Sequence, residues 1–164
     1  MSLKMYYESS IALKTVPKEI FAYIDDHKSF SSHMAKPSWM MGGGSMKVTM
    51  DKGNGQRIGS HIRLNGKAFG INLFLDEVIT KYTPPHIKSW ETVGTPKLLV
   101  IGSYKMGIEI KEEDNGSNVH VFIDYQLPKT NIWLGILFSK LYAKWCVHKM
   151  IRGAREHFTK EDFS

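Results

Sequence analysis

The C-terminal part of the chain constrains the fold more than any other feature. Residues 131–158 contain no proline and carry large apolar side chains at helical spacing, with lysines and arginines beside them. This pattern predicts one helix over residues 131–158, roughly 40 Å long at ~1.5 Å per residue. The apolar stripe that should face the rest of the protein consists of Leu134, Leu137, Leu141, Trp145, His148 and Ile151. Because the mean helix has only ~11–12 residues, such a helix requires an unusually long surface to cover.

The middle of the chain supplies such a surface. Residues 45–127 read as six strands separated by turns rich in glycine, proline and asparagine, and these connections are too short for parallel crossovers. Apolar and polar residues alternate along several strands, so one face of the sheet should be apolar and the other wet. Asn65-Gly66 is the strongest hairpin signal, because both central residues of a type I′ turn need positive φ. We therefore expect an antiparallel meander whose apolar face is covered by the C-terminal helix.

The first part of the chain predicts a strand and two short helices. Residues 6–13 are rich in strand-forming side chains and precede Pro17, which suits the first turn of a helix because it has no amide hydrogen to lose. A second short helix is expected over residues 27–34. Residues 38–44 place Trp39 and Met41 beside three glycines. Two interpretations stay open for this loop: its apolar side chains fill the edge of the core, or they form a lid over a pocket.

The composition is that of an ordinary globular protein, and we expect residues 1–164 to form a single domain. Cys146 is the sole cysteine and no Cys/His spacing resembles a zinc site, so we expect no metal, no cofactor and a reducing compartment. The first residues lack the apolar core of a signal peptide. The longest apolar run, residues 132–138, is much shorter than the ~20 residues of a spanning helix. These features predict a cytoplasmic protein without a transmembrane segment.

The formal net charge of +6 is compatible with attraction to nucleic acid, an anionic membrane or an acidic ligand. The lysines are spread along the whole chain, and no run of basic residues alternates with aromatic ones. Nucleic-acid binding usually shows a concentrated basic patch. We therefore expect a solvated basic surface and no nucleic-acid partner.

Three stretches of the chain resemble one superfamily. Residues 10–25 (SIALKTVPKEIFAYID) are similar to its opening strand and first helix, residues 79–90 (ITKYTPPHIKSW) to a strand, a double-proline turn and the next strand, and residues 119–128 to the strand before its last helix. Together with the order of elements, they make the chain resemble the SRPBCC superfamily, which includes START lipid-transfer domains, polyketide cyclases and coenzyme Q-binding proteins. The resemblance implies an α+β helix-grip fold, in which a curved seven-stranded antiparallel sheet wraps around a long C-terminal helix, with two short helices between strands 1 and 2. It also implies a ligand held between sheet and helix, and names no particular molecule.

The implied cavity leads to a set of candidate ligand-binding residues, most of which lie on the apolar faces of the predicted strands and helix. The expected walls are Ile71, Leu73, Trp90, Tyr104, Met106, Ile123, Tyr125, Leu137 and Leu141, with Trp39 and Met41 at the mouth. His148 and Glu77 are the candidate polar anchors for a head group. A bulge near Asp76 would turn Glu77 outward. Plain core packing is the other interpretation for each of these residues.

The sequence favours a binding protein over an enzyme. No nucleophile lies beside a base in a local motif and no metal cluster is suggested, so no residue is assigned a catalytic role. The first function expected is therefore binding, transport or sequestration of a hydrophobic small molecule or lipid. A polyketide cyclase or dehydrase acting in the same cavity is the alternative, because some relatives use only Tyr, Arg, His and Trp residues of the pocket.

Residues 98–101, Leu-Leu-Val-Ile, support a third interpretation. Both faces of this expected strand start are apolar, so the chain itself, a partner or a second copy must cover one of them. A partner would make the protein an interaction module, like the co-chaperone and ribosome-associated members of the superfamily. A second copy would make it a homodimer.

Overall fold

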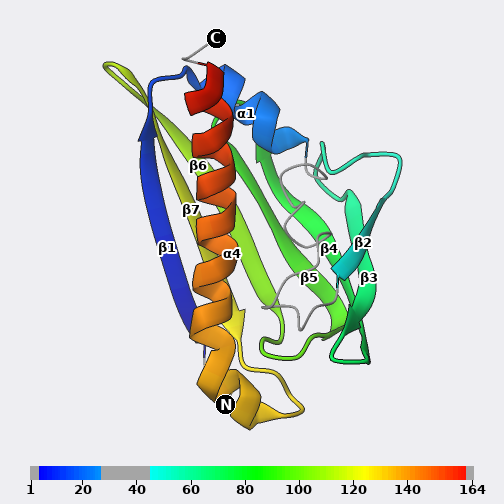
Figure 1. The fold of residues 1–164 in the computed structure, drawn as a ribbon. Coiled ribbons are helices and arrows are strands. Elements are labelled where there is room, and N and C mark those ends of the chain that lie inside the picture. Colours follow the sequence, from blue (N-terminus) through cyan, green and yellow to red (C-terminus); the bar gives the residue numbers. More distant parts are fainter. Residues whose placement is uncertain (1–3, 27–44, 162–164) are drawn as a thin grey trace.

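The predicted meander is present as one antiparallel sheet. The computed structural model describes residues 4–26 and 45–161, and seven strands pair in the order β1-β7-β6-β5-β4-β3-β2. The strands are β1 Lys4–Leu13, β2 Ser45–Met50, β3 His61–Ala68, β4 Ile71–Thr83, β5 Ile87–Lys97, β6 Tyr104–Glu113 and β7 Gly116–Gln126. The sheet curves around the long helix α4, Ile132–Glu161 (Figure 1). The helix-grip fold expected from the sequence is therefore confirmed.

One short helix, α1 (Pro17–Asp25), follows β1, and Pro17 lies in its first turn as predicted. The apolar face of α1 is buried through Ile20, Phe21 and Ile24. The second short helix expected over residues 27–34 lies outside the described residues, as do Trp39 and Met41.

An ion pair joins the end of α1 to the sheet. The Lys88 ammonium lies 3.1 Å from Oδ1 of Asp25, and the lysine side chain is 0% exposed. The Tyr82 hydroxyl donates to Oδ2 of Asp25 at 2.6 Å. Burial, followed by this hydrogen bond, raises the pKa of Tyr82 to about 12. Burial also lowers the pKa of Lys88 in spite of the attraction to Asp25, so the pair fixes α1 against β4 and β5 at a large desolvation penalty.

Helix α4 contains 30 residues, which corresponds to ~45 Å. Of the strands, it packs most closely against β1 and β7. The backbone before it turns at Asn131, where φ is 57°, and the amide of Leu134 donates to the carbonyl of Asn131 at 2.9 Å. The predicted position of the helix is thus confirmed to within a turn at each end.

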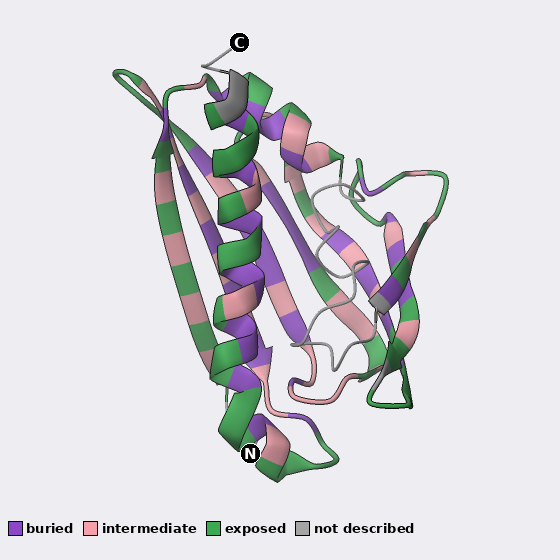
Figure 2. Ribbon diagram, viewed as in Figure 1, coloured by how far each residue is buried: buried purple, intermediate pink, exposed green. Residues whose placement is uncertain are grey.

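The predicted apolar stripe of α4 is wrong at three of its six residues, whereas Ile151 is buried as predicted. Leu137 and Leu141 are 64% and 47% exposed, and His148 is exposed as well; Figure 2 shows the exposed outer side of the helix. The buried face consists of Ser139, Tyr142, Ala143, Cys146, Val147, Met150, Ile151, Ala154 and Phe158. Small residues lie along this side, and a Cβ added at Gly135 would lie only 2.4 Å from Cδ of Pro128. The spacing of large side chains indicated one face, whereas close packing selected a face with small residues.

The turn between β3 and β4 also differs from the predicted one. Asn65-Gly66 lies inside β3, and the hairpin turns at Phe69-Gly70, whose φ angles are 53° and 75°. The observed register places Leu64 opposite Leu75, and both side chains are buried. A two-residue turn at Asn65-Gly66 would place Leu64 opposite Lys67 and mix the two faces of the sheet. Burial of apolar side chains therefore overrode the local turn preference.

Residues 98–101 form the loop between β5 and β6, so the prediction of a strand start is wrong. Ile101 is buried, whereas Leu98, Leu99 and Val100 are half-buried. The neighbouring Gly102 lies against the backbone of β7, where an added Cβ would approach the Leu127 carbonyl to 2.8 Å. The chain itself thus covers part of this apolar run.

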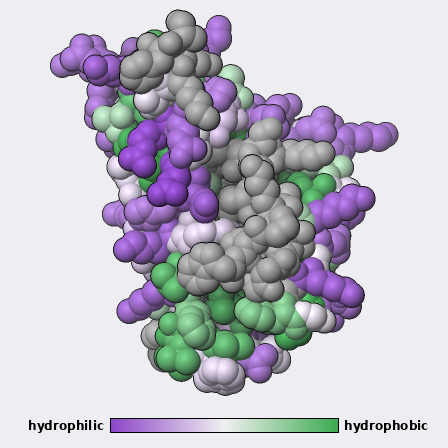
Figure 3. Space-filling model, viewed as in Figure 1, coloured by the Kyte–Doolittle hydropathy of each residue, from purple (hydrophilic) through white to green (hydrophobic). Residues whose placement is uncertain are grey.

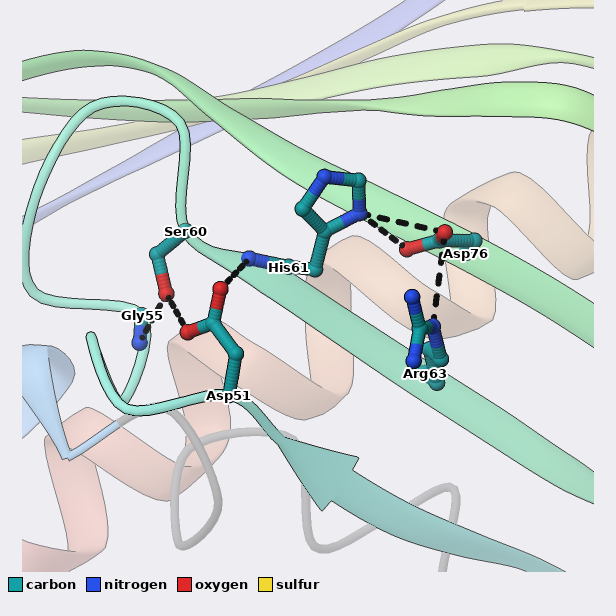
Figure 4. Close-up of polar contacts among 6 residues, drawn as sticks. All are labelled: Asp51, Gly55, Ser60, His61, Arg63 and Asp76. Carbon is teal, nitrogen blue, oxygen red and sulfur yellow. Dashed lines mark hydrogen bonds and ion pairs between the residues drawn. The ribbon is translucent and has the colours of Figure 1, made fainter.

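A carboxylate orders the connection between β2 and β3 (Figure 4). Asp51 accepts hydrogen bonds from the Ser60 hydroxyl at 2.6 Å and from the amides of His61 and Gly53 at 2.8 and 2.9 Å. These hydrogen bonds, that of Ser60 most of all, lower the pKa of Asp51 to about 2. On the outer side of β3 and β4, the His61 ring lies 2.9 Å from the Asp76 carboxylate.

The stability of the protein should depend on Asp51 in acid. The pKa of Asp51 is about 2 in the folded chain and 3.8 ordinarily, so its contribution is complete above the ordinary pKa and is lost as the pH falls toward about 2. Asp51→Asn should therefore unfold more readily than the wild type at neutral pH, and the difference should shrink between pH ~4 and ~2. Urea denaturation of both proteins between pH ~4 and ~2 measures this difference in the free energy of unfolding. A difference that is constant with pH would contradict the assignment.

Candidate functional site

A small pocket lies between the sheet and α4. Its volume is about 30 Å³, which is room for roughly one or two water molecules. The pocket is lined by Leu64, Leu75, Glu77, Trp90, Leu98, Ile101, Tyr104, Met106, Ile123, Tyr142, Cys146 and Met150. The described side chains of the grip therefore fill most of the space between sheet and helix. We call this space the inner pocket.

The inner pocket contains a buried carboxylate. Glu77 lies on the same inward-facing side of β4 as Leu73 and Leu75, and its side chain is buried. The irregular pairing of β4 with β5 falls between Phe74 and Asp76, and it does not turn Glu77 outward. The hydroxyl of Tyr104 donates a hydrogen bond to Oε1 of Glu77. The alternation of β4 thus places an acid inside the grip.

The other titratable groups of the inner pocket are held in their neutral forms. Burial and the charge of Glu77 raise the pKa of Tyr104 well above its usual range, so the phenol remains a hydrogen-bond donor. Burial, followed by the proximity of Cys146, raises the pKa of Tyr142 in the same direction. Burial raises the pKa of the Cys146 thiol to about 12. Because the thiolate is the reactive form, Cys146 is not a nucleophile at neutral pH.

A second, larger hollow opens where α4 begins. Its volume is about 380 Å³, and it is lined by Phe69, Ile71, Leu99, Val100, Leu134, Phe138, Leu141 and Tyr142. These side chains come from the β3–β4 hairpin, the β5–β6 loop and the first turns of α4. All of them except the hydroxyl of Tyr142 are apolar. We call this hollow the mouth.

The mouth and the inner pocket share a wall. Tyr142 lines both of them. The β5–β6 loop also contributes to both, through Leu98 and Ile101 on the inner side and through Leu99 and Val100 on the outer side. One residue of α4 and one loop therefore separate an open apolar hollow from a buried pair of polar side chains.

The structure places ten of the twelve predicted site residues, in four groups. Trp90, Tyr104, Met106 and Ile123 line the inner pocket, whereas Ile71 and Leu141 line the mouth. Leu73 and Tyr125 are buried in the core and line neither space. Leu137 and His148 face outward on α4. Trp39 and Met41 lie outside the described residues.

His148 was expected on the apolar face of the helix, and that placement is wrong. It is exposed, and its ring hydrogen-bonds to the hydroxyl of Tyr7 on β1 at 2.5 Å. It borders a surface hollow with Lys149, Arg152 and Arg155. A histidine here lies outside the grip, so it cannot anchor a ligand held inside it.

Several lining residues were not selected as ligand-binding from the sequence. In the mouth these are Phe69, Leu99, Val100, Leu134, Phe138 and Tyr142. A signal existed for some of them, because the run at residues 98–101 was recognised as apolar on both faces and Leu134 belonged to the predicted stripe. Phe69 also carried a signal, because strand alternation placed it on the same predicted face as Ile71 and Leu73.

The described residues contain no group of three His, Cys, Asp or Glu side chains that could hold a metal ion. Among the helices in the described part of the chain, none is both long and apolar enough to cross a membrane.

The curved sheet, the long helix laid across it and the short helix after β1 define a helix-grip protein. No protein-family model matches the sequence, and no curated protein matches it. Solved structures do match the fold. Protein CV1439 from Chromobacterium violaceum is 13% identical with a TM-score of 0.59, and the match covers 93% of this chain and 96% of that one.

Two further solved structures share the same fold. Norcoclaurine synthase from Thalictrum flavum, solved with dopamine and hydroxybenzaldehyde, is 9% identical with a TM-score of 0.68, and the match covers 97% of this chain and 88% of that one. The di-domain ARO/CYC StfQ of the steffimycin biosynthetic pathway is 9% identical with a TM-score of 0.70. That match covers 99% of this chain and 53% of StfQ, so the chain spans about half of that protein. The chain therefore has the same helix-grip fold as these solved structures.

Proposed function

We propose that the protein binds a hydrophobic small molecule in the mouth, between the first turns of α4, the β3–β4 hairpin and the β5–β6 loop. The observation that carries this proposal is a hollow of about 380 Å³ with an apolar lining, open at one end of the grip. Ligand sites are typically clefts of ~300–1,000 Å³ with mostly apolar walls and a few polar groups. A ligand that buries about 200 Å² of apolar surface there would gain about 5 kcal/mol from desolvation.

The polar end of such a ligand is best placed toward Tyr142. This phenol lies between the two spaces, and the Glu77–Tyr104 pair lies behind it. The Tyr142 phenol already donates a hydrogen bond to Cys146, and its oxygen can accept a further one from a ligand hydroxyl at the inner end of the mouth. The site therefore suits an elongated lipophile with a single polar end.

The same geometry favours binding over the alternative of a polyketide cyclase. A cyclase would need its substrate to reach an acid or base, and the buried carboxylate lies in a pocket of only about 30 Å³. Burial also keeps the thiol of Cys146 and the phenol of Tyr104 protonated. Retention of an unchanged lipophile requires none of these groups to react.

Leu141→Glu should weaken the binding of N-phenyl-1-naphthylamine, a neutral fluorescent lipophile, by about tenfold, because it places a carboxylate in the apolar wall. Leu137→Glu is the matched control. Leu137 lies one turn earlier on α4, is exposed and does not line the mouth, so its affinity should stay within about twofold of wild type. Fluorescence titration measures both variants. Equal dye affinities of wild type and Leu141→Glu would contradict the proposed ligand site.

A further inference from the structure

The surface beside the mouth is unusually apolar. A set of large side chains, each half exposed or more, lies at this end of the molecule; we call it the apolar tip, and it consists of Phe69, Ile132, Trp133, Ile136 and Leu137. Figure 3 shows the hydrophobic side chains gathered where α4 begins. Clusters of this kind are uncommon on monomeric proteins and mark interaction surfaces.

Exposed lysines lie around the apolar tip. The segments that meet at this end, residues 67–71, 97–104 and 125–144, contain no aspartate or glutamate. Their charged side chains are lysines only, and those at positions 67, 97, 129, 140 and 144 are exposed. The net charge of +6 is spread along the sequence, and these five lysines give the apolar tip a basic rim.

We propose that the apolar tip docks on the surface of an anionic lipid bilayer. Trp133, Ile136 and Leu137 would enter the boundary between head groups and acyl chains, where tryptophan is favoured. The surrounding lysines would meet the anionic head groups, with their aliphatic stems lying along the apolar surface. The docked state would be peripheral, with the side chains of the apolar tip reaching only the boundary between head groups and acyl chains.

The charge pattern distinguishes this partner from a second copy of the chain. A symmetric dimer through the apolar tip would bring the same patch from both subunits together. Lys140 and Lys144 of one subunit would then approach their equivalents with no acidic residue of the patch to offset them. An anionic bilayer instead satisfies the apolar and the basic parts of the surface together.

Docking in this orientation would also place the mouth at the membrane, because Phe69 belongs both to the apolar tip and to the lining of the mouth. A lipophile could then pass from the bilayer into the site without crossing water. The docking proposal does not depend on the proposed ligand site, since it is carried by the exposed side of α4 and its charges.

The test is co-sedimentation of the full chain with vesicles of phosphatidylcholine, with and without about 30% phosphatidylserine. Phosphatidylserine should raise the apparent affinity about tenfold at about 0.1 M salt, and this gain should largely disappear at about 0.5 M salt. Leu137→Glu should lower the affinity for the anionic vesicles about tenfold. Ile58→Glu is the matched control, because Ile58 is 65% exposed and lies in the β2–β3 connection, outside the apolar tip. It should bind as the wild type does.

Brominated lipids should quench the fluorescence of wild type, and Trp133→Phe should lose most of that quenching. Docking is overturned if anionic lipid gives no gain, if Leu137→Glu binds like Ile58→Glu, or if the tip instead forms a dimer that Leu137→Glu dissociates in sedimentation velocity. Binding of N-phenyl-1-naphthylamine in the absence of vesicles tests the ligand site independently of membrane docking. Leu137→Glu should still bind the dye, whereas Leu141→Glu should not, whatever the vesicles show.

Discussion

Asp25→Ala should lower the free energy of unfolding by about 3–5 kcal/mol, the largest effect expected of a single substitution outside the hydrophobic core. The substitution removes the carboxylate 3.1 Å from the ammonium of Lys88, whose side chain has no exposed surface. The charge on Lys88 would then be buried without its counter-ion. Tyr82 would lose its acceptor as well.

Urea denaturation at neutral pH measures this effect, and two comparisons make it specific. Replacing the pair together, as Asp25→Leu with Lys88→Met, should return the stability to within about 1 kcal/mol of wild type, since it removes the desolvation penalty and the attraction at once. Glu109→Ala removes a half-exposed carboxylate 4.0 Å from His120 and should change stability by less than about 1 kcal/mol. If Asp25→Ala were as mild as Glu109→Ala, the buried ion pair would not be a stabilising contact.

Tyr104→Phe should lower the free energy of unfolding by about 2–3 kcal/mol. The phenol is buried and donates to Glu77, whose carboxylate is buried in the inner pocket. Phenylalanine keeps the ring and removes only that donor. Hydrogen bonds to a charged group in a site of low dielectric are stronger than those exposed to water, and their loss leaves a buried charge less well solvated.

Tyr6→Phe provides the matched comparison, because Tyr6 donates to Glu8 at 2.7 Å on the exposed surface of β1. Its loss should change stability by less than about 0.5 kcal/mol. The double variant Tyr104→Phe with Glu77→Leu should recover most of the stability lost in Tyr104→Phe, because neither polar group is then left without the other. Thermal and urea unfolding of the four proteins give the coupling energy, and a coupling near zero would mean that the hydrogen bond is not formed.

Much of the fold could be predicted from the sequence because its signals are local and repeated. Alternation along Val119, Val121, Ile123 and Tyr125 placed these residues on one face of β7, and the structure buries all four. Pro17 marked the start of α1, and a long segment without proline marked α4. Each of these patterns follows from the period of a strand or a helix, which requires no knowledge of the partner element.

The site could be predicted only in part, because pockets form between elements. Tyr104, Met106 and Ile123 were correctly placed at the inner face of the sheet, since strand parity determines that face, and Trp90 lies there too although its strand alternates less cleanly. Parity also brought Glu77 inside, although the sequence could not exclude a bulge that would turn it outward. The mouth is formed where a hairpin tip, a loop and a helix end pack together. No repeating sequence pattern predicts how such segments are arranged.

The long C-terminal helix shows both what the sequence determined and what it left open. Its existence and approximate ends were determined by the sequence alone, because helical spacing and the absence of proline are local properties. Which side of it would be buried was decided by the tertiary structure. Two sides of its first turns carry apolar residues, and the sheet selected the side with Ser139 and Ala143, which permits close approach. That choice left Leu137 and its neighbours exposed, at an end of the molecule where Lys129, Lys140 and Lys144 are exposed as well.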